Sequence, residues 1–274
     1  MDKYSAILCD ERLLSCAAYY FCRDAGLDKR YPMKEPQPEL IERLVQTGVL
    51  EASGHSLTDA RFGYACYEYY RQSYRPDAFD KLLLKEAEGK ASILDLCCGS
   101  GATVLALLDS SADRKIYAVD RDPFALSLLR SVLAYRHADP EAAIVQAADA
   151  HAVGAADQSI DFIVCRAALQ YLQVPAALKE MHRVLRHGGK VFVVVHGPGY
   201  MPDYLFVRRR LFAMSGTMNV SGGAKGAKFL TFGSLRTMLA EAGFDSIHYV
   251  EEREWMFAGI LPIYFGIVAE KRQR

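Results

Sequence analysis

From about residue 92 onward, short apolar runs alternate with segments whose apolar residues recur at helical spacing. Short apolar runs are typical of buried strands, and a repeat of 3.6 residues is typical of helices. The pattern predicts strands over 93–96, 115–120, 143–147, 161–165 and 190–195, and helices over 102–108, 122–136 and 174–187. This alternation indicates parallel βαβ units with helices on both faces of the sheet.

The rhythm changes after residue 195. Residues 197–228 contain Pro-Gly bends and a helix-like run over 204–214, and we expect this long excursion to be either a lid or a flexible segment. A helix over about 233–242 and two β-rich runs, 245–251 and 261–269, end the chain as a hairpin. The expected fold class is therefore α/β, a doubly wound, Rossmann-like sheet of seven mostly parallel strands.

The first 75 residues have a different pattern. Apolar residues at helical spacing and the amphipathic run 40–50 predict a mainly helical segment. We therefore divide the chain into a helical region, 1–75, which we expect to serve as a lid and substrate-binding segment or as a dimerisation segment, and a core domain, 76–274, that carries the lid insertion at 197–228.

Composition removes several classes of protein. Lys and Arg total 33, as do Asp and Glu, so a broad surface for nucleic acid is not expected. The seven cysteines match neither a zinc site nor a disulfide framework, which indicates a reducing cytoplasm and no metal. The N-terminus has no signal-peptide pattern, and the longest apolar stretch is too short to span a membrane.

The strongest chemical signal is the junction after the first predicted strand. Asp95 ends that strand, and Gly99 and Gly101 form a tight turn into a helix, where a nucleotide-like ligand meets a doubly wound sheet. A dinucleotide-binding turn requires a third glycine where Val104 stands, and no phosphate-binding Gly-Lys-Ser/Thr follows.

The segment Asp95-Leu-Cys-Cys-Gly-Ser-Gly101 instead resembles motif I of the class I S-adenosylmethionine-dependent methyltransferases, and the core is similar to the ubiquinone-biosynthesis-like branch. Further motifs follow in that family's order at Asp120, Asp149, 161–164 and 181–190. The resemblance implies S-adenosylmethionine as cofactor and S-adenosylhomocysteine as product. It also implies that Asp120 accepts hydrogen bonds from the ribose hydroxyls and that Asp149 meets the adenine amino group.

The cofactor-binding residues predicted in this way lie at the strand ends and one helix end. They are Arg75, Asp95, Cys97, Gly99, Gly101, Asp120, Arg121, Asp149, Ala150 and Cys165. Cys97 departs from the family, which commonly has Gly there, and we expect tighter packing beside the methionine part of the cofactor. Arg75 resembles an arginine that pairs with the cofactor carboxylate.

The sequence offers fewer indications of which residues bind the methyl acceptor. His196 follows the fifth strand and is the first candidate for a general base, with a solvent-facing loop histidine as the alternative. Tyr70 and Tyr74 belong to a tyrosine-rich stretch that either packs a helix onto the sheet or roofs the site, and Tyr200 and Tyr204 offer an apolar lid lining. The run 208–210 of three arginines either meets an anionic acceptor or is a solvated helix face.

Residues 40–58 also resemble the winged-helix dimerisation module of small-molecule O-methyltransferases, which implies a homodimer through the N-terminal region. Those enzymes carry a His-Asp base pair after the fourth strand, where this chain has 165–171, Cys-Arg-Ala-Ala-Leu-Gln-Tyr. The resemblance therefore does not bring that mechanism with it.

Together these features predict an enzyme that transfers a methyl group to a small-molecule, lipid-like or short peptide acceptor. Because the sulfonium already activates the methyl group, positioning and desolvation carry most of the catalysis. The alternatives are a non-catalytic cofactor-binding regulatory or partner protein, and an aminopropyl transferase. The acceptor, the methylated atom (O, N or C), the use of a base and the oligomeric state stay open.

Overall fold

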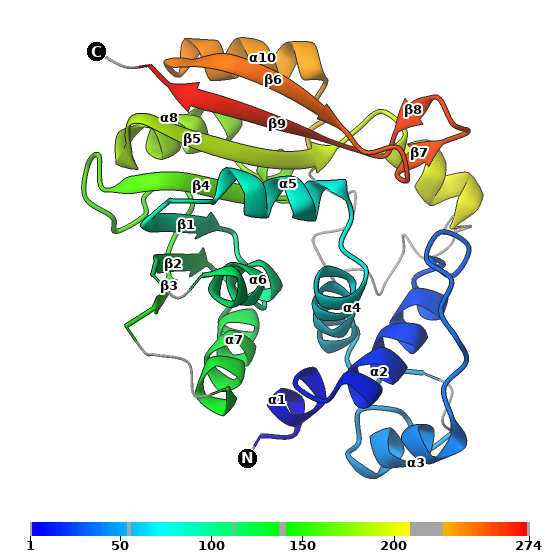
Figure 1. The fold of residues 1–274 in the computed structure, drawn as a ribbon. Coiled ribbons are helices and arrows are strands. Elements are labelled where there is room, and N and C mark those ends of the chain that lie inside the picture. The colour runs from blue at the N-terminus through cyan, green and yellow to red at the C-terminus, as the bar shows by residue number, and fades with distance from the viewer. Residues whose placement is uncertain (1, 54–55, 112, 137–140, 209–226, 273–274) are drawn as a thin grey trace.

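The computed structural model describes residues 2–53, 56–111, 113–136, 141–208 and 227–272. Its centre is a seven-stranded sheet in the order β3-β2-β1-β4-β5-β9-β6 (Figure 1). Strands β1 to β5 are mutually parallel where they pair, and β9 is antiparallel to both of its neighbours. The strands are β1 Ser92–Leu96, β2 Lys115–Asp120, β3 Ala143–Ala147, β4 Ile160–Arg166, β5 Leu185–His196, β6 Phe244–Glu251 and β9 Tyr264–Lys271. The predicted sheet is confirmed.

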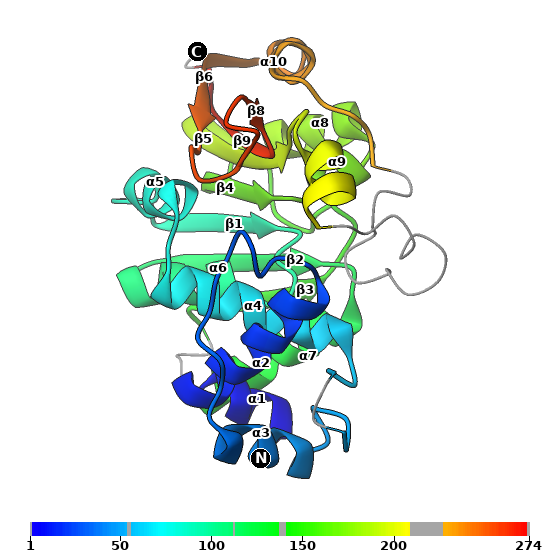
Figure 2. The same ribbon diagram turned by 90° about the vertical axis from the view of Figure 1, so that its right-hand side faces the viewer.

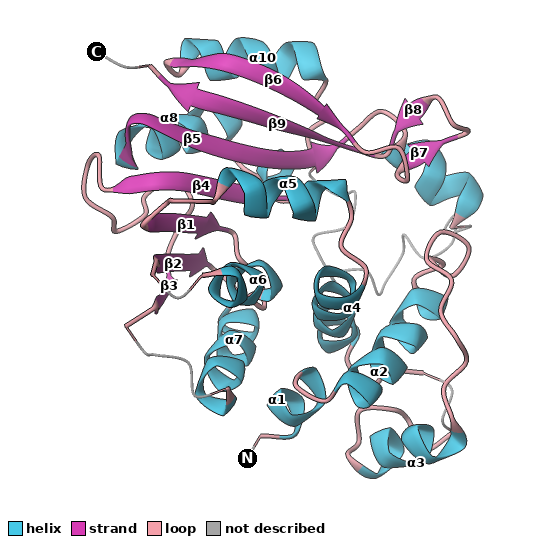
Figure 3. Cartoon of the chain, viewed as in Figure 1, coloured by secondary structure: helices cyan, strands magenta, loops and turns pink. Residues whose placement is uncertain are grey.

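Successive residues of the central strands serve two different cores. Ile93 packs with one hydrophobic cluster, while its neighbour Leu94 packs with another, because successive side chains of a strand point to opposite faces. One face is covered by α5 Ala78–Glu86, α6 Ala102–Ser110 and α7 Pro123–Tyr135, and the other by α8 Val174–Val184 and α10 Phe232–Glu241. Figure 3 shows these layers of helix and strand.

The local signals at helix ends hold in most places. Asp122 accepts a hydrogen bond from the amide of Phe124, and Pro123 occupies the first turn of α7, as the Asp-Pro pair predicted. The helix predicted over 174–187 was too long. Helix α8 ends at Val184, and Leu185 already pairs with Ile160 as the first residue of β5. The following glycines lie within this strand, at an irregular register, and do not stop the helix.

The C-terminal hairpin is also confirmed, with an addition. Strands β6 and β9 pair in antiparallel fashion, and the connection between them carries a small two-stranded sheet of β7 Met256–Phe257 and β8 Leu261–Pro262. Before this hairpin, the described part of the expected lid forms α9 Tyr200–Pro202 and a π-helical turn, η2 Asp203–Val207. The rest of the helix predicted over 204–214 lies outside the described residues.

The N-terminal region forms α1 Lys3–Leu8, α2 Glu11–Asp24, α3 Pro38–Gln46 and α4 Ala60–Tyr74. These helices share a hydrophobic cluster with α6 and α7, through residues such as Leu105 and Val132. The tyrosine-rich helix α4 therefore packs on α2 and on α6, beside the sheet domain (Figure 2), and does not pack on the sheet itself.

Residues 38–58 place a helix, a Gly-Val-Leu bend and an antiparallel bridge between Leu50 and Leu57 in succession. This order agrees with the winged-helix resemblance, although the module and the dimer it implies stay predictions. Within the described residues, no helix combines the length and apolar character needed to cross a membrane.

Candidate cofactor and acceptor site

A large cavity, lined by residues of α4, lies at the carboxyl ends of β1, β2, β4 and β5. Its volume is about 1280 Å³, above the usual range of roughly 300–1,000 Å³ for small-molecule pockets. The cavity therefore has room for two molecules side by side. It brings together predicted residues from six segments, namely Asp95, Cys97, Gly99, Asp120, Arg121, Asp149, Ala150, His196, Tyr200 and Tyr204.

The loop after β1 is shaped by backbone that favours glycine. Gly101 has φ +86°, and a Cβ atom at this position would lie 2.3 Å from a methyl carbon of Leu129. Gly99 has φ +54°, with open space where a side chain would stand. Gly99 lines the cavity, whereas Gly101 sits behind it as the N-cap of α6. Gly99 thus allows the backbone to approach a ligand closely, whereas Gly101 allows α6 to pack closely against α7.

Cys97 adopts the same left-handed backbone region, with φ +61°. This conformation costs a non-glycine residue roughly 1–2 kcal/mol, which explains why glycine is common here in the family that motif I resembles. Its side chain packs against the core cluster that contains Cys165. Cys165 itself is fully buried and does not line the cavity, so it acts behind Cys97 and not at the cavity surface.

Asp120 fixes the next wall of the cavity. One carboxylate oxygen accepts a hydrogen bond from the Gly99 amide at 2.8 Å, and the other accepts from the Asp122 amide at 2.9 Å. The end of β2 is thereby tied to the glycine loop and to the start of α7. Each oxygen keeps a further lone pair, so this carboxylate can still accept from the hydroxyls of a ribose.

Asp149 lies at the edge of the cavity on the far side of Asp120. Its Oδ1 atom accepts from the backbone amide of His151 and lies 2.5 Å from the Nδ1 atom of that ring. These hydrogen bonds lower the pKa of Asp149 and keep it ionised. His151 Nε2 accepts from the amide of Gln173 at 3.0 Å, which fixes the proton on Nδ1. His151 therefore orients Asp149, and the exposed carboxylate is free to meet an amino group.

Asp95, at the start of this loop, has a carboxylate oxygen without a hydrogen-bond partner among the described residues. This oxygen is Oδ2, and the residue is 3 % exposed. Burial raises its pKa to about 7, with Arg166 opposing that rise and Asp120 adding to it. A buried acceptor of this kind suits a cationic ligand group, and the ammonium of the methionine part of S-adenosylmethionine is such a group.

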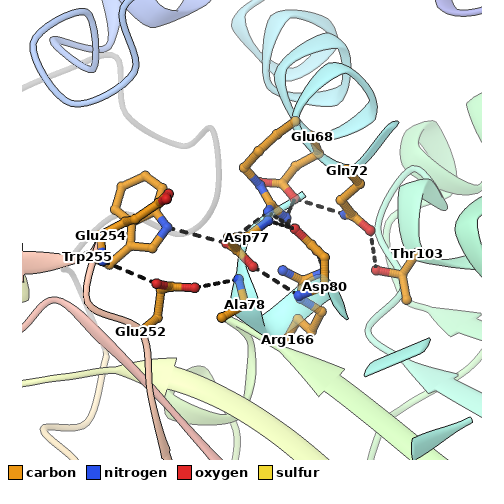
Figure 4. Close-up of polar contacts among 11 residues, drawn as sticks. Glu68, Gln72, Asp77, Ala78, Asp80, Thr103, Arg166, Glu252, Glu254 and Trp255 are labelled. Atoms are coloured by element: carbon orange, nitrogen blue, oxygen red, sulfur yellow. Dashed lines mark hydrogen bonds and ion pairs between the residues drawn. The ribbon is translucent and has the colours of Figure 1, made fainter. Parts of the chain in front are cut away.

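A buried network of charges supports this corner, and the sequence interpretation missed it. Arg71 of α4 contacts the carboxylates of Asp77 at 3.0 Å, Asp80 at 2.5 Å and Glu68 at 3.1 Å. Asp80 also pairs with Arg166 at the end of β4, at 2.5 Å. Figure 4 shows how the network reaches Trp255, whose indole N–H donates to Asp77. Its members are spread over 187 positions of sequence, from 68 to 255, so no local motif could reveal it.

Besides Gly101 and Cys165, three further predicted residues lie away from the cavity. Arg75 is exposed, donates to the carbonyl of Pro32 at 2.9 Å and has its guanidinium 4.2 Å from the ring centroid of Tyr31. Tyr70 and Tyr74 contact each other on the outer side of α4. Arg71, which lies one helical turn before Arg75, lines the cavity. Tyr64 and Tyr67 of α4 line the cavity instead.

The other end of the cavity is aromatic. The imidazole of His196 stacks on the ring of Tyr200 with centroids 3.6 Å apart, and Tyr171 and Tyr264 approach it edge-on at 5.8 Å and 5.4 Å. Burial, together with the nearby Arg208 cation, lowers the pKa of His196 to about 3. The ring is therefore neutral and a weak proton acceptor, so the structure favours a role in the cavity wall over the predicted role of general base.

The central part of the chain is similar to known methyltransferases. Residues 93–189 match the family of methyltransferase domains. An uncharacterised methyltransferase of Mycobacterium tuberculosis is 33% identical over 128 residues, which is 47% of this chain and 48% of the relative. A malonyl-[acyl-carrier protein] O-methyltransferase of Pseudescherichia vulneris is 33% identical over 148 residues, 53% of this chain and 55% of the relative. The chain thus spans about half the length of these relatives.

The fold is similar to that of solved methyltransferase structures. A crystal structure of an S-adenosylmethionine-dependent methyltransferase from Mesorhizobium loti superposes with a TM-score of 0.52 at 21% identity, covering 69% of this chain and 94% of that one. At 21% identity, this superposition shows a shared fold and no more. The methyltransferase domain is identified by the match of residues 93–189. Residues 93–189 therefore form a methyltransferase domain, and the chain shares the fold of solved S-adenosylmethionine-dependent methyltransferases.

Proposed function

We propose that the protein transfers the methyl group of S-adenosylmethionine to a small-molecule acceptor held in the aromatic end of the same cavity. The observation that carries this proposal is the continuity of the cavity, from Asp149 at one end to His196 and Tyr200 at the other. The described walls on the acceptor side come from α4, β5 and η2, which would enclose a small molecule more readily than a large polymer.

The residues of the donor end fit the cofactor. Asp120 would accept from the ribose hydroxyls, Asp149 and the Ala150 backbone would meet the adenine, and Asp95 would face the ammonium of the methionine part. When bound, S-adenosylmethionine supplies a methyl carbon that its sulfonium has already activated. Opposite charges stand beside that corner, since Asp95 and Arg166 both line the cavity, and this pairing suits a zwitterionic amino acid group.

The protein would align the two reactants and exclude water from the site of methyl transfer. Tyr64 and Tyr67 of α4 line the cavity and contact each other, and their rings would help to keep water out of it. Alignment of two bound reactants contributes up to roughly 7–11 kcal/mol in ideal cases. His196 would act as a neutral wall. An acceptor that is already a nucleophile at neutral pH would then need no base from the protein.

The test is a measurement of cofactor binding followed by turnover. Calorimetry should show binding of S-adenosylmethionine, and incubation with an acceptor library should release S-adenosylhomocysteine. His196→Phe, which keeps a flat ring, should retain most of the turnover if His196 is a wall and lose it if His196 is the base. Tight cofactor binding without turnover of any acceptor would favour the regulatory alternative.

A further inference from the structure

A buried cluster of two cations and one anion borders the acceptor end of the cavity. Asp203 of η2 is fully buried, and both of its oxygens are paired. Arg30 lies 2.5 Å from Oδ1, and Arg208 donates to Oδ2 through Nε at 2.9 Å. One carboxylate thus faces two guanidinium groups, which leaves the cluster with one net positive charge.

The excess charge of this cluster faces the cavity. Arg208 lines the cavity, whereas Arg30 does not, and Arg30 spends a further donor on the carbonyl of Met256 at 2.9 Å. The Arg208 side chain is only 10% exposed, yet its Nη2 atom has no hydrogen-bond partner in the described structure. A buried donor without a partner is costly, and a charged one more so. Because Arg208 lines the cavity, a small rotation of its guanidinium would bring this unpaired donor to an acceptor group of a bound ligand.

The surfaces beside Arg208 are flat and neutral. The guanidinium carbon lies 5.5 Å from the ring centroid of Tyr200, which itself stacks on His196. Tyr264 stands edge-on to both rings, at 5.4 Å from His196 and 5.9 Å from Tyr200. Such walls suit a planar, conjugated body, because aromatic rings pack by stacking and by edge-to-face contact.

We propose that the methyl acceptor is a planar molecule bearing a carboxylate, and that Arg208 Nη2 binds this carboxylate while the His196–Tyr200 pair holds the planar body. This inference rests on the proposed function and names the class of its acceptor. The single net charge of the cluster matches the single charge of a carboxylate better than the double charge of a phosphate monoester. A guanidinium is also the group that recognises carboxylates most specifically in proteins.

The test uses calorimetry on the whole protein saturated with S-adenosylhomocysteine, so that the donor end is filled. The probes are trans-cinnamate and its neutral isostere trans-cinnamamide. The unaltered protein should bind the carboxylate at least tenfold more tightly than the amide. Arg208→Gln should abolish this preference and leave the affinity for the amide within twofold. Arg136→Gln, which removes a cation paired with Asp109 outside the cavity, should leave the preference intact.

Three results would overturn the inference. They are equal affinities of the unaltered protein for the two probes, an equal loss of both in Arg208→Gln, and tighter binding of phenyl phosphate than of cinnamate. The first and third need no variant, so the test stands even if Arg208→Gln does not fold. The affinity for S-adenosylmethionine is measured on the same protein preparations before S-adenosylhomocysteine is added. Normal binding of S-adenosylmethionine with no preference for the carboxylate would reject the inference and leave the proposed function standing.

Discussion

The hydroxyl of Tyr69 donates a hydrogen bond of 2.6 Å to the backbone carbonyl of Ser100, and so joins the N-terminal region to the cofactor loop. A second bond, from the Thr103 hydroxyl to Gln72 at 3.1 Å, repeats the connection one turn further along α4. Both partners on the loop side belong to the motif I turn or the helix that follows it. The N-terminal helices therefore help to shape the donor site, whatever their role in dimerisation.

Removal of this hydroxyl should loosen the cofactor loop. Tyr69→Phe leaves the Ser100 carbonyl without its buried donor, and we expect a loss of about 1 kcal/mol in the free energy of unfolding. The affinity for S-adenosylmethionine should fall several-fold, because the loop is less firmly held. Chemical denaturation and calorimetry measure the two effects, with Tyr135→Phe at an exposed tyrosine as control. Unchanged values in Tyr69→Phe would show that α4 merely lies beside the loop.

Asp120 should be indispensable for cofactor binding. Asp120→Ala removes the acceptor for the Gly99 and Asp122 amides along with the proposed ribose contact, so we expect the affinity for S-adenosylmethionine to fall at least tenfold. Asp109→Ala, at an exposed aspartate that pairs with Arg136, should leave the affinity unchanged. Equal affinities of Asp120→Ala and the unaltered protein in calorimetry would reject the assignment of the donor end.

The donor end was predictable because each of its parts is local in sequence. A strand, a glycine turn and an acidic residue at the next strand end follow one another within 26 positions, from Asp95 to Asp120, and the parallel sheet then brings the ends together. The nearly continuous burial of β1 and β4 likewise follows from their mostly apolar sequences. Local pattern and global fold agree throughout this half of the molecule.

The acceptor end was predictable only in part, because its contacts are long-range. Arg30 and Asp203 stand 173 positions apart, and nothing in either local sequence indicates that they pair. His196 was found by its place after β5, but its pKa depends on burial by rings and on Arg208, which only the folded chain shows. Arg75 was named from a family resemblance, whereas Arg71, one helical turn earlier, lines the cavity, and sequence position alone does not say which arginine faces inward.

Asp95 should make the ligand-free protein less stable as pH rises. Its pKa in the folded state is about 7, against 3.8 for the free side chain, so the folded state holds a proton on Asp95 that the unfolded state has already lost. The free energy of unfolding therefore falls as the pH rises from about 4 to about 7. Asp95→Asn carries no such charge. Urea denaturation at pH 8 should therefore find the variant more stable by on the order of 2–4 kcal/mol, with little difference near pH 4. Parallel stability curves across this range would contradict the burial of an unpaired carboxylate.

The same carboxylate should make cofactor binding depend on pH. The ammonium of S-adenosylmethionine favours ionised Asp95, so below pH 7 binding must first remove the proton and becomes weaker. We expect the dissociation constant to rise several-fold from pH 8 to pH 6, and binding near pH 7 to release a proton. Calorimetry in buffers with different ionisation enthalpies measures that release. Asp95→Asn should bind more weakly at pH 8 and lose the pH dependence over this range.

Cys97 offers the sharpest test of how the loop conformation matters to the site. Cys97→Gly relieves the cost of the positive φ, roughly 1–2 kcal/mol. It also removes the packing of the thiol and raises the conformational entropy of the unfolded chain, and both of these effects lower stability. The gain and the losses oppose each other, so we expect stability to change by no more than about 1 kcal/mol and cofactor affinity to stay the same or rise. Cys97→Val puts a β-branched side chain at the same φ, where such residues are rarely tolerated, and should lower both. Denaturation and calorimetry on the pair decide the matter. If Cys97→Gly lost cofactor affinity tenfold, the thiol itself would be a binding group, and its departure from the family would be functional and not merely tolerated.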